Sequence, residues 1–258
     1  MVFYHNLSPK SHSSNTLRSA IISLCFKTNH MIYTLPVADV LLKETLLEDD
    51  FNSNYEGWEM IVDEDEKSFI KDSYYWMENK SDSRWMFYHK KMPITKGENF
   101  IINAEIELLG SKGYGQYGLV WGFSKPHEVL NRFTVSADAN RFSVLKFDKD
   151  HFRNYHRYSG KFEKPAQSNK KQFFSIMRLD DYYYFFLGEF DRPVYTCHQS
   201  HLSMDGLRFG FYIEPGILIR CNKITVKRLI TNQSFDGRLW MPVDDNLKPL
   251  GSELIRGN

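Results

Sequence analysis

Two glutamates that stand two residues apart are the first candidates for chemistry in this sequence. Glu105 and Glu107 lie in the segment Phe100-Ile-Ile-Asn-Ala-Glu-Ile-Glu-Leu, in which apolar and polar residues alternate. In a strand, residues i and i+2 point to the same face, so the two carboxylates are expected to project together. A pair of carboxyl groups about 5 to 5.5 Å apart suits a retaining glycoside hydrolase. A strand face exposed to water explains the same two residues, and both interpretations stay open.

A basic and aromatic segment is the second candidate. The run His151-Phe-Arg-Asn-Tyr-His-Arg-Tyr158 is followed by several lysines, namely Lys161, Lys164, Lys170 and Lys171. As a strand, it places Arg153, Tyr155 and Arg157 on one face and Tyr158 on the other. Because arginine pairs with carboxylates or sulfates, this surface suits an anionic glycan or an acidic protein patch, with the rings stacking on sugar faces. The alternative is an exposed edge strand whose charges prevent aggregation.

Motifs for other chemistries are missing from the sequence. There is no Gly-x-Ser-x-Gly nucleophile elbow, and Gly110-Ser-Lys-Gly113-Tyr-Gly115 lacks the Gly-Lys-Ser/Thr ending of a phosphate-binding loop. No Cys and His residues have zinc spacing. Oxygen-rich stretches at Asp49-Asp50 and Asp63–Glu66 are of the type that calcium needs, but Asp63–Glu66 is explained more simply as a solvated turn. We therefore expect no metal, no cofactor and no enzymatic activity.

The overall charge and the cysteines limit the classes of partner. The formal net charge is +1, whereas a nucleic-acid-binding domain is expected to be basic, so no nucleic-acid partner is predicted. The apolar run 20–26 is far shorter than the ~20 residues that span a bilayer, and it makes a poor signal peptide. Cys197 and Cys221 are either two buried thiols or a disulfide in an exported chain. With Cys25 the count is odd, which favours a reducing, cytoplasmic location.

The elements that must position these residues are predicted to be strands. Aromatic residues make up 16% of the chain, and they favour pleated, half-buried surfaces. Apolar segments recur every 10 to 15 residues, as in a sandwich or barrel. The predicted strands are 57–62, 69–78, 84–90, 100–109, 117–123, 130–137, 142–147, 152–158, 173–178, 182–190, 194–198, 207–213 and 217–229.

Alternation within two of these segments predicts which side chains face a core. Ile102, Ala104, Ile106 and Leu108 share one face of their segment, and Tyr117, Leu119, Trp121 and Phe123 share one face of the next. We divide the chain into a loosely ordered tail or linker over 1–46, a single sandwich over 47–230 and an irregular extension over 231–258. Val37 to Leu47 suits a short helix or a linker, and Met31 is an alternative start.

The order of motifs resembles the concanavalin A-like and laminin-G-like jelly rolls, especially a bacterial sandwich often appended to larger proteins. The resemblance runs from Asp49 to Arg228, and its more specific motifs are Tyr117-Gly-Leu-Val-Trp-Gly122 and Gly206-Leu-Arg-Phe-Gly-Phe-Tyr212. It implies an antiparallel jelly-roll β-sandwich that binds glycans, binds proteins or serves as a spacer. The Glu-x-Asp-x-x-Glu pattern of jelly-roll glucanases is absent around Glu105 and Glu107.

The sequence therefore predicts a non-enzymatic binding module whose partner is a glycan or another protein. A structural domain without a small ligand and a glycoside-active enzyme that uses the paired glutamates are the alternatives. The candidate ligand-binding residues are Arg153, Tyr155, Arg157, Tyr158, Trp121, Glu105 and Glu107.

Overall fold

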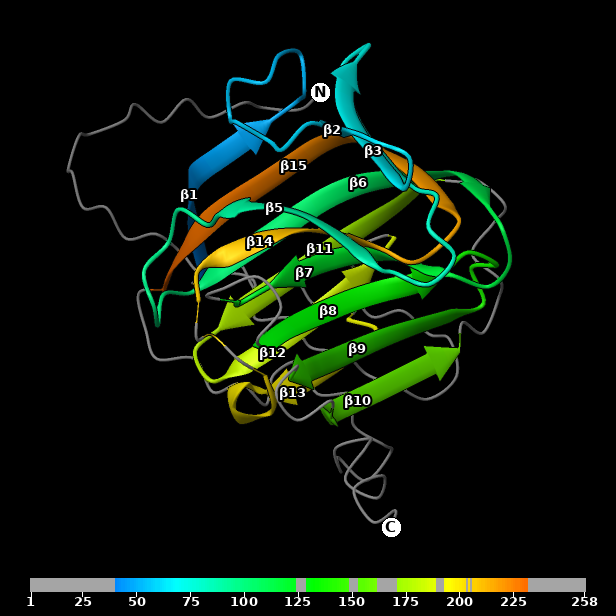
Figure 1. Cartoon of the computed structure of the whole chain (residues 1–258). Coiled ribbons are helices and arrows are strands. Elements are labelled where there is room, and N and C mark those ends of the chain that lie inside the picture. Colours follow the sequence, from blue (N-terminus) through cyan, green and yellow to red (C-terminus); the bar gives the residue numbers. More distant parts are fainter. Residues whose placement is uncertain are drawn as a thin grey trace, which may run out of the picture.

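A computed structural model shows the chain as two packed antiparallel β-sheets (Figure 1). It describes residues 40–123, 129–148, 153–161, 171–188, 193–202, 204 and 206–231. Within these residues the only helical element is a 3-10 turn over Gln199–His201. The predicted all-β jelly-roll sandwich is therefore confirmed.

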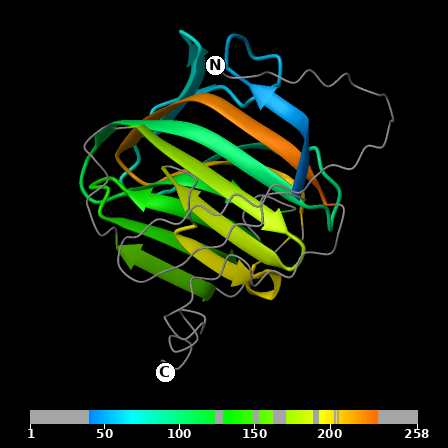
Figure 2. The same cartoon turned by 180° about the vertical axis from the view of Figure 1, so that it is seen from behind.

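The larger sheet, here called sheet A, has nine strands and lies in front in Figure 2. Its order is β13-β12-β11-β6-β15-β4-β3-β2, and β1 pairs with β15. The strands are β1 (Val40–Asp49), β2 (Ile61–Val62), β3 (Glu66–Lys71), β4 (Tyr74–Asn79), β6 (Phe100–Ser111), β11 (Lys171–Leu179), β12 (Tyr182–Leu187), β13 (Tyr195–His198) and β15 (Ile217–Thr231).

The smaller sheet, here called sheet B, has six strands in the order β10-β9-β8-β7-β14-β5 and lies in front in Figure 1. Every strand pairing described in the two sheets is antiparallel. The strands of sheet B are β5 (Met86–Lys91), β7 (Gln116–Trp121), β8 (Val129–Ser136), β9 (Arg141–Asp148), β10 (Arg153–Lys161) and β14 (Arg208–Ile213).

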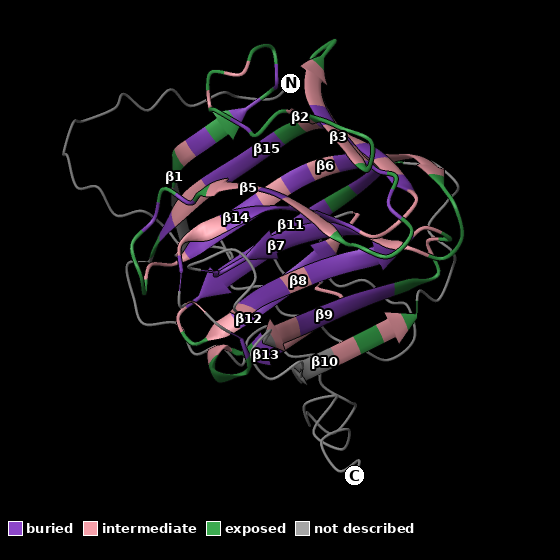
Figure 3. Cartoon of the chain, in the orientation of Figure 1, coloured by how far each residue is buried: buried purple, intermediate pink, exposed green. Residues whose placement is uncertain are grey.

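One hydrophobic core fills the space between the sheets, and its buried residues follow the middle strands of both layers (Figure 3). Strand β6 contributes Ile102, Ala104 and Ile106, and β7 contributes Tyr117 and Trp121, as the alternation predicts. Because successive side chains of a strand point to opposite faces, the residues between these positions point to the outer faces of the sandwich. On sheet B some of them, with Phe123 beyond the end of β7, form a second buried cluster: Val120, Phe123, Leu130 and Tyr212. Those outer faces are where a ligand can reach the sheets.

The start of the sandwich lies earlier than predicted. Residues 40–46 are neither a helix nor a linker, because β1 pairs with residues 224–231 of β15. Ion pairs join Glu44 to Arg228 at 2.6 Å and Glu48 to Lys223 at 2.5 Å. Two register shifts interrupt β1, and each one breaks the period-2 pattern by which a strand is recognised. The predicted tail up to residue 39 and the extension from residue 232 lie outside the described residues.

A second difference concerns the predicted strand 69–78, which is a hairpin of β3 and β4. The two-residue turn consists of Asp72 and Ser73, with φ of 53° and 58°. Positive φ at both positions is the geometry of a type I′ turn, which Asn-Gly usually provides. Since neither asparagine nor glycine is present, the sequence carries no clear signal for this turn.

Candidate functional site

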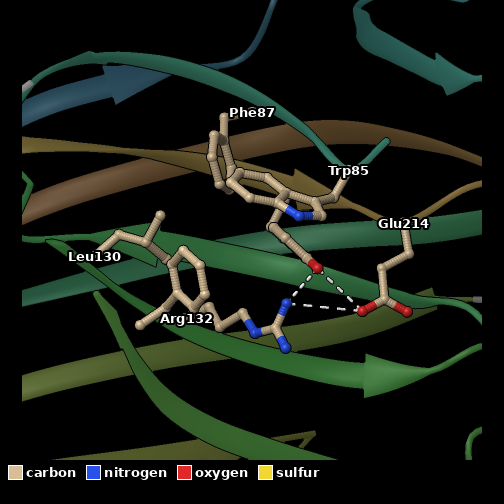
Figure 4. A pocket seen from close by; sticks show the side chains of 7 residues that line it. Trp85, Phe87, Leu130, Arg132 and Glu214 are labelled. Carbon is tan, nitrogen blue, oxygen red and sulfur yellow. Dashed lines mark hydrogen bonds and ion pairs between the residues drawn. The ribbon is translucent and has the colours of Figure 1, made fainter. Parts of the chain in front are cut away.

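A hollow on the outer face of sheet B is the candidate functional site (Figure 4). Phe133 on β8 and Phe211 on β14 point into the core, so their neighbours Arg132 and Tyr212 point outward. The hollow has a volume of about 280 Å³. Residues of strands β5, β8, β9 and β14, one residue just before β5 and one just after β14 line the hollow. They are Trp85, Phe87, Leu130, Arg132, Phe147, Tyr212 and Glu214.

Aromatic rings form one wall of the hollow. The ring centroid of Trp85 lies 4.5 Å from that of Phe87 and 6.0 Å from that of Phe147. Phe87 in turn lies 5.6 Å from Tyr212, whose side chain is buried. Trp85 nevertheless keeps 36% of its surface exposed, so a packed and oriented indole faces solvent. An aromatic side chain held in this way can contact a ligand without a large loss of conformational entropy.

The polar wall is a group of three side chains, Arg132, Tyr212 and Glu214. Arg132 Nη1 donates a hydrogen bond to the Tyr212 hydroxyl and lies 3.7 Å from Glu214 Oε1. The Tyr212 hydroxyl donates to Glu214 Oε1 at 3.0 Å, and the backbone N–H of Gln116 donates to Glu214 Oε2 at 2.9 Å. The Arg132 guanidinium also lies over the Tyr212 ring, 4.7 Å from its centroid. These contacts hold the cation and the carboxylate side by side in fixed positions.

Burial further favours the neutral form of the tyrosine in this group. Because Tyr212 is buried, the pKa of its phenol is raised well above the ordinary value. The hydroxyl therefore stays protonated at neutral pH and donates a hydrogen bond to the Glu214 carboxylate. The whole group thus offers both hydrogen-bond donors and acceptors next to an apolar wall, the combination expected of a small-molecule site.

The two glutamates singled out in the sequence lie on the other side of the sandwich. Glu105 and Glu107 do share one face of β6, as predicted, but it is the outer face of sheet A. Glu105 forms an ion pair with Lys171, and Glu107 pairs with Arg220 at 2.7 Å. The structure therefore does not bring them together with the hollow.

The other predicted ligand-binding residues are also separated from the hollow. Trp121 is fully buried between the sheets, with its ring 5.6 Å from that of Phe185 on β12. It is a core residue, because its position on β7 faces inward. Tyr158 on β10 packs against the core, and its ring stacks on Tyr195 at 4.0 Å.

The basic segment forms β10, an edge strand of sheet B. Its backbone register places Arg153 opposite Asp148 and Arg157 opposite Leu145 on β9. A register shift between Asn154 and His156 interrupts the alternation that the sequence suggested. The side chains of Arg153, Tyr155 and Arg157 lie outside the described residues.

Sequence reasoning missed the residues of the hollow, and the reason is the distance between them in the chain. Trp85 and Glu214 are 129 positions apart and become neighbours only because β5 pairs with β14. One local signal in the sequence could have indicated part of the site. Arg132 is a charged residue within the largely apolar strand β8, and such a residue is expected to point outward and to pair with an opposite charge.

The acidic stretches are occupied by contacts within the chain. Asp49 accepts hydrogen bonds from Trp58 Nε1 and the backbone of Phe51, both at 2.8 Å. Asp63 accepts from the backbone N–H groups of Asp65 and Glu66, as in a turn. Among the described residues, no three His, Cys, Asp or Glu side chains are grouped so that they could hold a metal ion.

The remaining predictions concern cysteines and membranes. Cys197 and Cys221 are both free and buried, so they are not joined in a disulfide. Burial raises the pKa of the Cys197 thiol to about 12 and also raises that of Cys221. No helix in the described ranges is long and apolar enough to cross a membrane.

Comparisons with known proteins identify the fold but not a family. No family model and no curated protein matches the sequence. An endo-β-1,3-glucanase from Pyrococcus furiosus aligns with a TM-score of 0.54 and 8% identity over 76% of this chain and 100% of that one. The CBM2 module of the evolved Dit of Lactobacillus casei BL23 phage J-1 aligns with a TM-score of 0.53 and 11% identity over 74% and 98%.

A third solved structure is a Bacillus subtilis protein of unknown function with a galectin-like fold. It aligns with a TM-score of 0.52 and 13% identity over 73% of this chain and 98% of that one. At such low identities the three alignments show a shared fold.

The comparisons correct the expectation that the chain is not an enzyme. A glucanase shares the fold over its full length, so this architecture supports glycoside hydrolysis in another protein. Missing sequence motifs therefore give no ground for excluding an activity. The chain has the concanavalin A-like jelly-roll β-sandwich fold.

Proposed function

We propose that this protein binds a saccharide in the hollow on the outer face of sheet B. The observation that carries the proposal is the exposed indole of Trp85 beside the fixed pair of Arg132 and Glu214. A pyranose ring has apolar C–H faces and a polar rim of hydroxyls. The aromatic wall suits the C–H face, and the polar wall suits the rim.

Each group has a distinct part in this proposal. Trp85 packs against one face of the sugar ring, where burial of apolar surface contributes most of the affinity. Arg132 donates to hydroxyl oxygens and Glu214 accepts from hydroxyl hydrogens, since an ionised carboxylate has about four acceptor sites. The name of the aligned glucanase supports glycan as the ligand class.

The test is a glycan array followed by calorimetric titration of the strongest ligand. We expect Trp85→Ala to weaken binding by about tenfold, which corresponds to about 1.4 kcal/mol. The matched control is Phe173→Ala, because Phe173 is an aromatic residue on the outer face of sheet A with 43% exposure. This control should leave the affinity unchanged. Absence of binding over a broad panel of glycans would contradict the proposal and would favour a protein-interaction or structural role.

Glycoside hydrolysis is the second candidate function, and the shared fold of the glucanase favours it. It is tested by incubating the protein with β-1,3-glucan and measuring the release of reducing ends. Loss of release in Glu214→Gln would place the reaction in the hollow. Loss in Glu107→Gln would place it on the outer face of sheet A, where Glu105 and Glu107 lie. Reducing ends at the level of a protein-free control would contradict this candidate.

A further inference from the structure

We infer that the ligand of the hollow is an uncharged sugar and that Glu214 is the residue that discriminates against acidic sugars. This inference rests on the proposed function, because it concerns the ligand class of the same hollow. The observation behind it is the charge of the lining. Five of its seven residues are uncharged, and the other two, Arg132 and Glu214, carry opposite charges. The lining therefore has no net charge to offer an ionic ligand.

The position of Glu214 is fixed from two directions. Its Oε1 atom accepts from the Tyr212 hydroxyl at 3.0 Å, and its Oε2 atom accepts from the backbone of Gln116 at 2.9 Å. Moving this carboxylate away from an entering ligand would break both hydrogen bonds. A sugar hydroxyl can donate to its remaining lone pairs, whereas a sugar carboxylate has no proton to donate and meets a like charge.

The charge of Arg132 does not remove this repulsion. Its Nη1 group donates to the Tyr212 hydroxyl and lies 3.7 Å from Glu214 Oε1, and its guanidinium carbon lies over the Tyr212 ring. Because Glu214 balances the charge of Arg132, an acidic sugar meets no net positive charge in this partly desolvated place. Unfavourable juxtaposition of like charges is a common source of specificity in binding sites.

This ligand class differs from the one that the basic segment suggested. Arg153 and Arg157 favour an anionic glycan, but they belong to the edge strand β10. Arg132 and Glu214 lie on β8 and at the end of β14, strands that lie on either side of β7. The ligand class of the hollow therefore follows from the balanced charges of Arg132 and Glu214 and not from the basic strand β10.

The experiment compares neutral glycans with acidic glycans of matched ring geometry. Three pairs of oligosaccharides of equal length and linkage serve as probes: β-1,4-glucan and β-1,4-glucuronan, β-1,4-mannan and β-1,4-mannuronan, and fully methyl-esterified galacturonan and free galacturonan. Affinities of the full chain are measured by titration calorimetry. We expect the neutral member of the bound pair to bind at least about tenfold more tightly, or about 1.4 kcal/mol.

Two variants should change the ratio of the affinities for the neutral and the acidic sugar in opposite directions. Glu214→Gln removes the like charge and leaves Arg132 with an uncompensated charge, so the preference for the neutral sugar should fall towards parity. Arg132→Gln leaves Glu214 without its counter-charge, so the preference should increase. The matched control is Glu78→Gln, because Glu78 on β4 also faces a cation, Lys80 at 3.7 Å, but lies on sheet A. Thermal unfolding verifies that each variant is folded.

The outcomes separate the two proposals. Equal or tighter binding of the acidic member by the wild-type protein overturns this inference while saccharide binding stands. An unchanged ratio in folded Glu214→Gln also overturns it. Failure of all six probes and of the glycan array overturns both the inference and the proposed function.

Discussion

Asp49 is a buried acid that holds a loop against the sandwich. Its side chain is 6% exposed, and its two oxygens accept hydrogen bonds from the indole of Trp58 and the backbone of Phe51. Trp58 packs its ring against Phe51 and Phe211, so the carboxylate positions a large part of the aromatic core. The role of this acid is therefore structural.

Replacement of Asp49 by alanine should destabilise the protein by about 2 to 3 kcal/mol, because two buried donors lose a charged acceptor. Urea unfolding measures the change. Asp50→Ala is the matched control, since Asp50 is exposed and its bonds to Asn52 are at the surface. This control should change stability by less than about 0.5 kcal/mol. Equal losses of unfolding free energy in the two variants would show that the hydrogen bond from Trp58 to Asp49 does not contribute specially to stability.

At the scale of elements, the β2–β3 hairpin concentrates acidic residues. Glu66 opens β3, and the acids Asp63, Asp65 and Glu59 lie close to it. Burial, followed by repulsion from Asp63, Glu59 and Asp65, raises the pKa of the Glu66 carboxyl above its ordinary value. A raised pKa means that the folded state favours the protonated form. The ionised carboxylate therefore opposes folding at neutral pH.

Glu66→Gln should stabilise the protein at pH 7 by less than about 1 kcal/mol, because solvent screens much of the repulsion. The gain should decrease as the pH falls through the folded pKa and should vanish below the pKa of the unfolded chain. Urea unfolding at several pH values measures this difference.

Glu48 on β1 is the control of opposite sign for this pH dependence. A hydrogen bond from Lys223 and its positive charge lower the pKa of the Glu48 carboxyl. Glu48→Gln should therefore reduce stability at pH 7, and the loss should disappear at acidic pH. A stabilising effect of Glu66→Gln that is independent of pH would contradict the electrostatic explanation.

At the scale of the whole molecule, both sheets share one core. Trp121 on β7 packs against Tyr183 and Phe185 on β12, which belongs to the opposite sheet. At the edges of the two sheets, Tyr158 on β10 stacks on Tyr195 on β13 with an angle of 11° between the rings. Neither sheet can therefore bury its inner face without the other.

We accordingly expect the sandwich to unfold in one cooperative transition. Tryptophan fluorescence reports on both sheets, because Trp58 and Trp121 lie in the shared core and Trp76 and Trp85 lie on the two outer faces. Urea curves from fluorescence and from far-UV circular dichroism should coincide. Separate midpoints would show that the two sheets unfold independently.

Much of the fold could be predicted from local patterns. The alternation through Ile102, Ala104 and Ile106 predicted the inner face of β6, because burial on one side imposes a period of two on a strand. The pattern failed at β1, where register shifts break the period, and at the turn of Asp72 and Ser73, which lacks the usual turn residues. Both failures concern backbone geometry that the side-chain pattern does not record.

The candidate glutamates show the corresponding limit for function. Spacing correctly predicted that Glu105 and Glu107 share a face. It could not show that Lys171 and Arg220 stand opposite them, because these partners come from β11 and β15. For the same reason, the sequence did not show that Trp85 and Glu214 lie next to each other, because they are brought together by the pairing of β5 with β14.

The amino-acid sequence by itself determined that this protein is an antiparallel sandwich, since strand alternation and aromatic content are local properties of the chain. Only the tertiary structure decided where a ligand can bind. Trp85, Arg132 and Glu214 become one hollow because β5, β8 and β14 meet in sheet B. Pairing between distant strands depends on how two whole sheets bury a common core, and no local pattern contains that information.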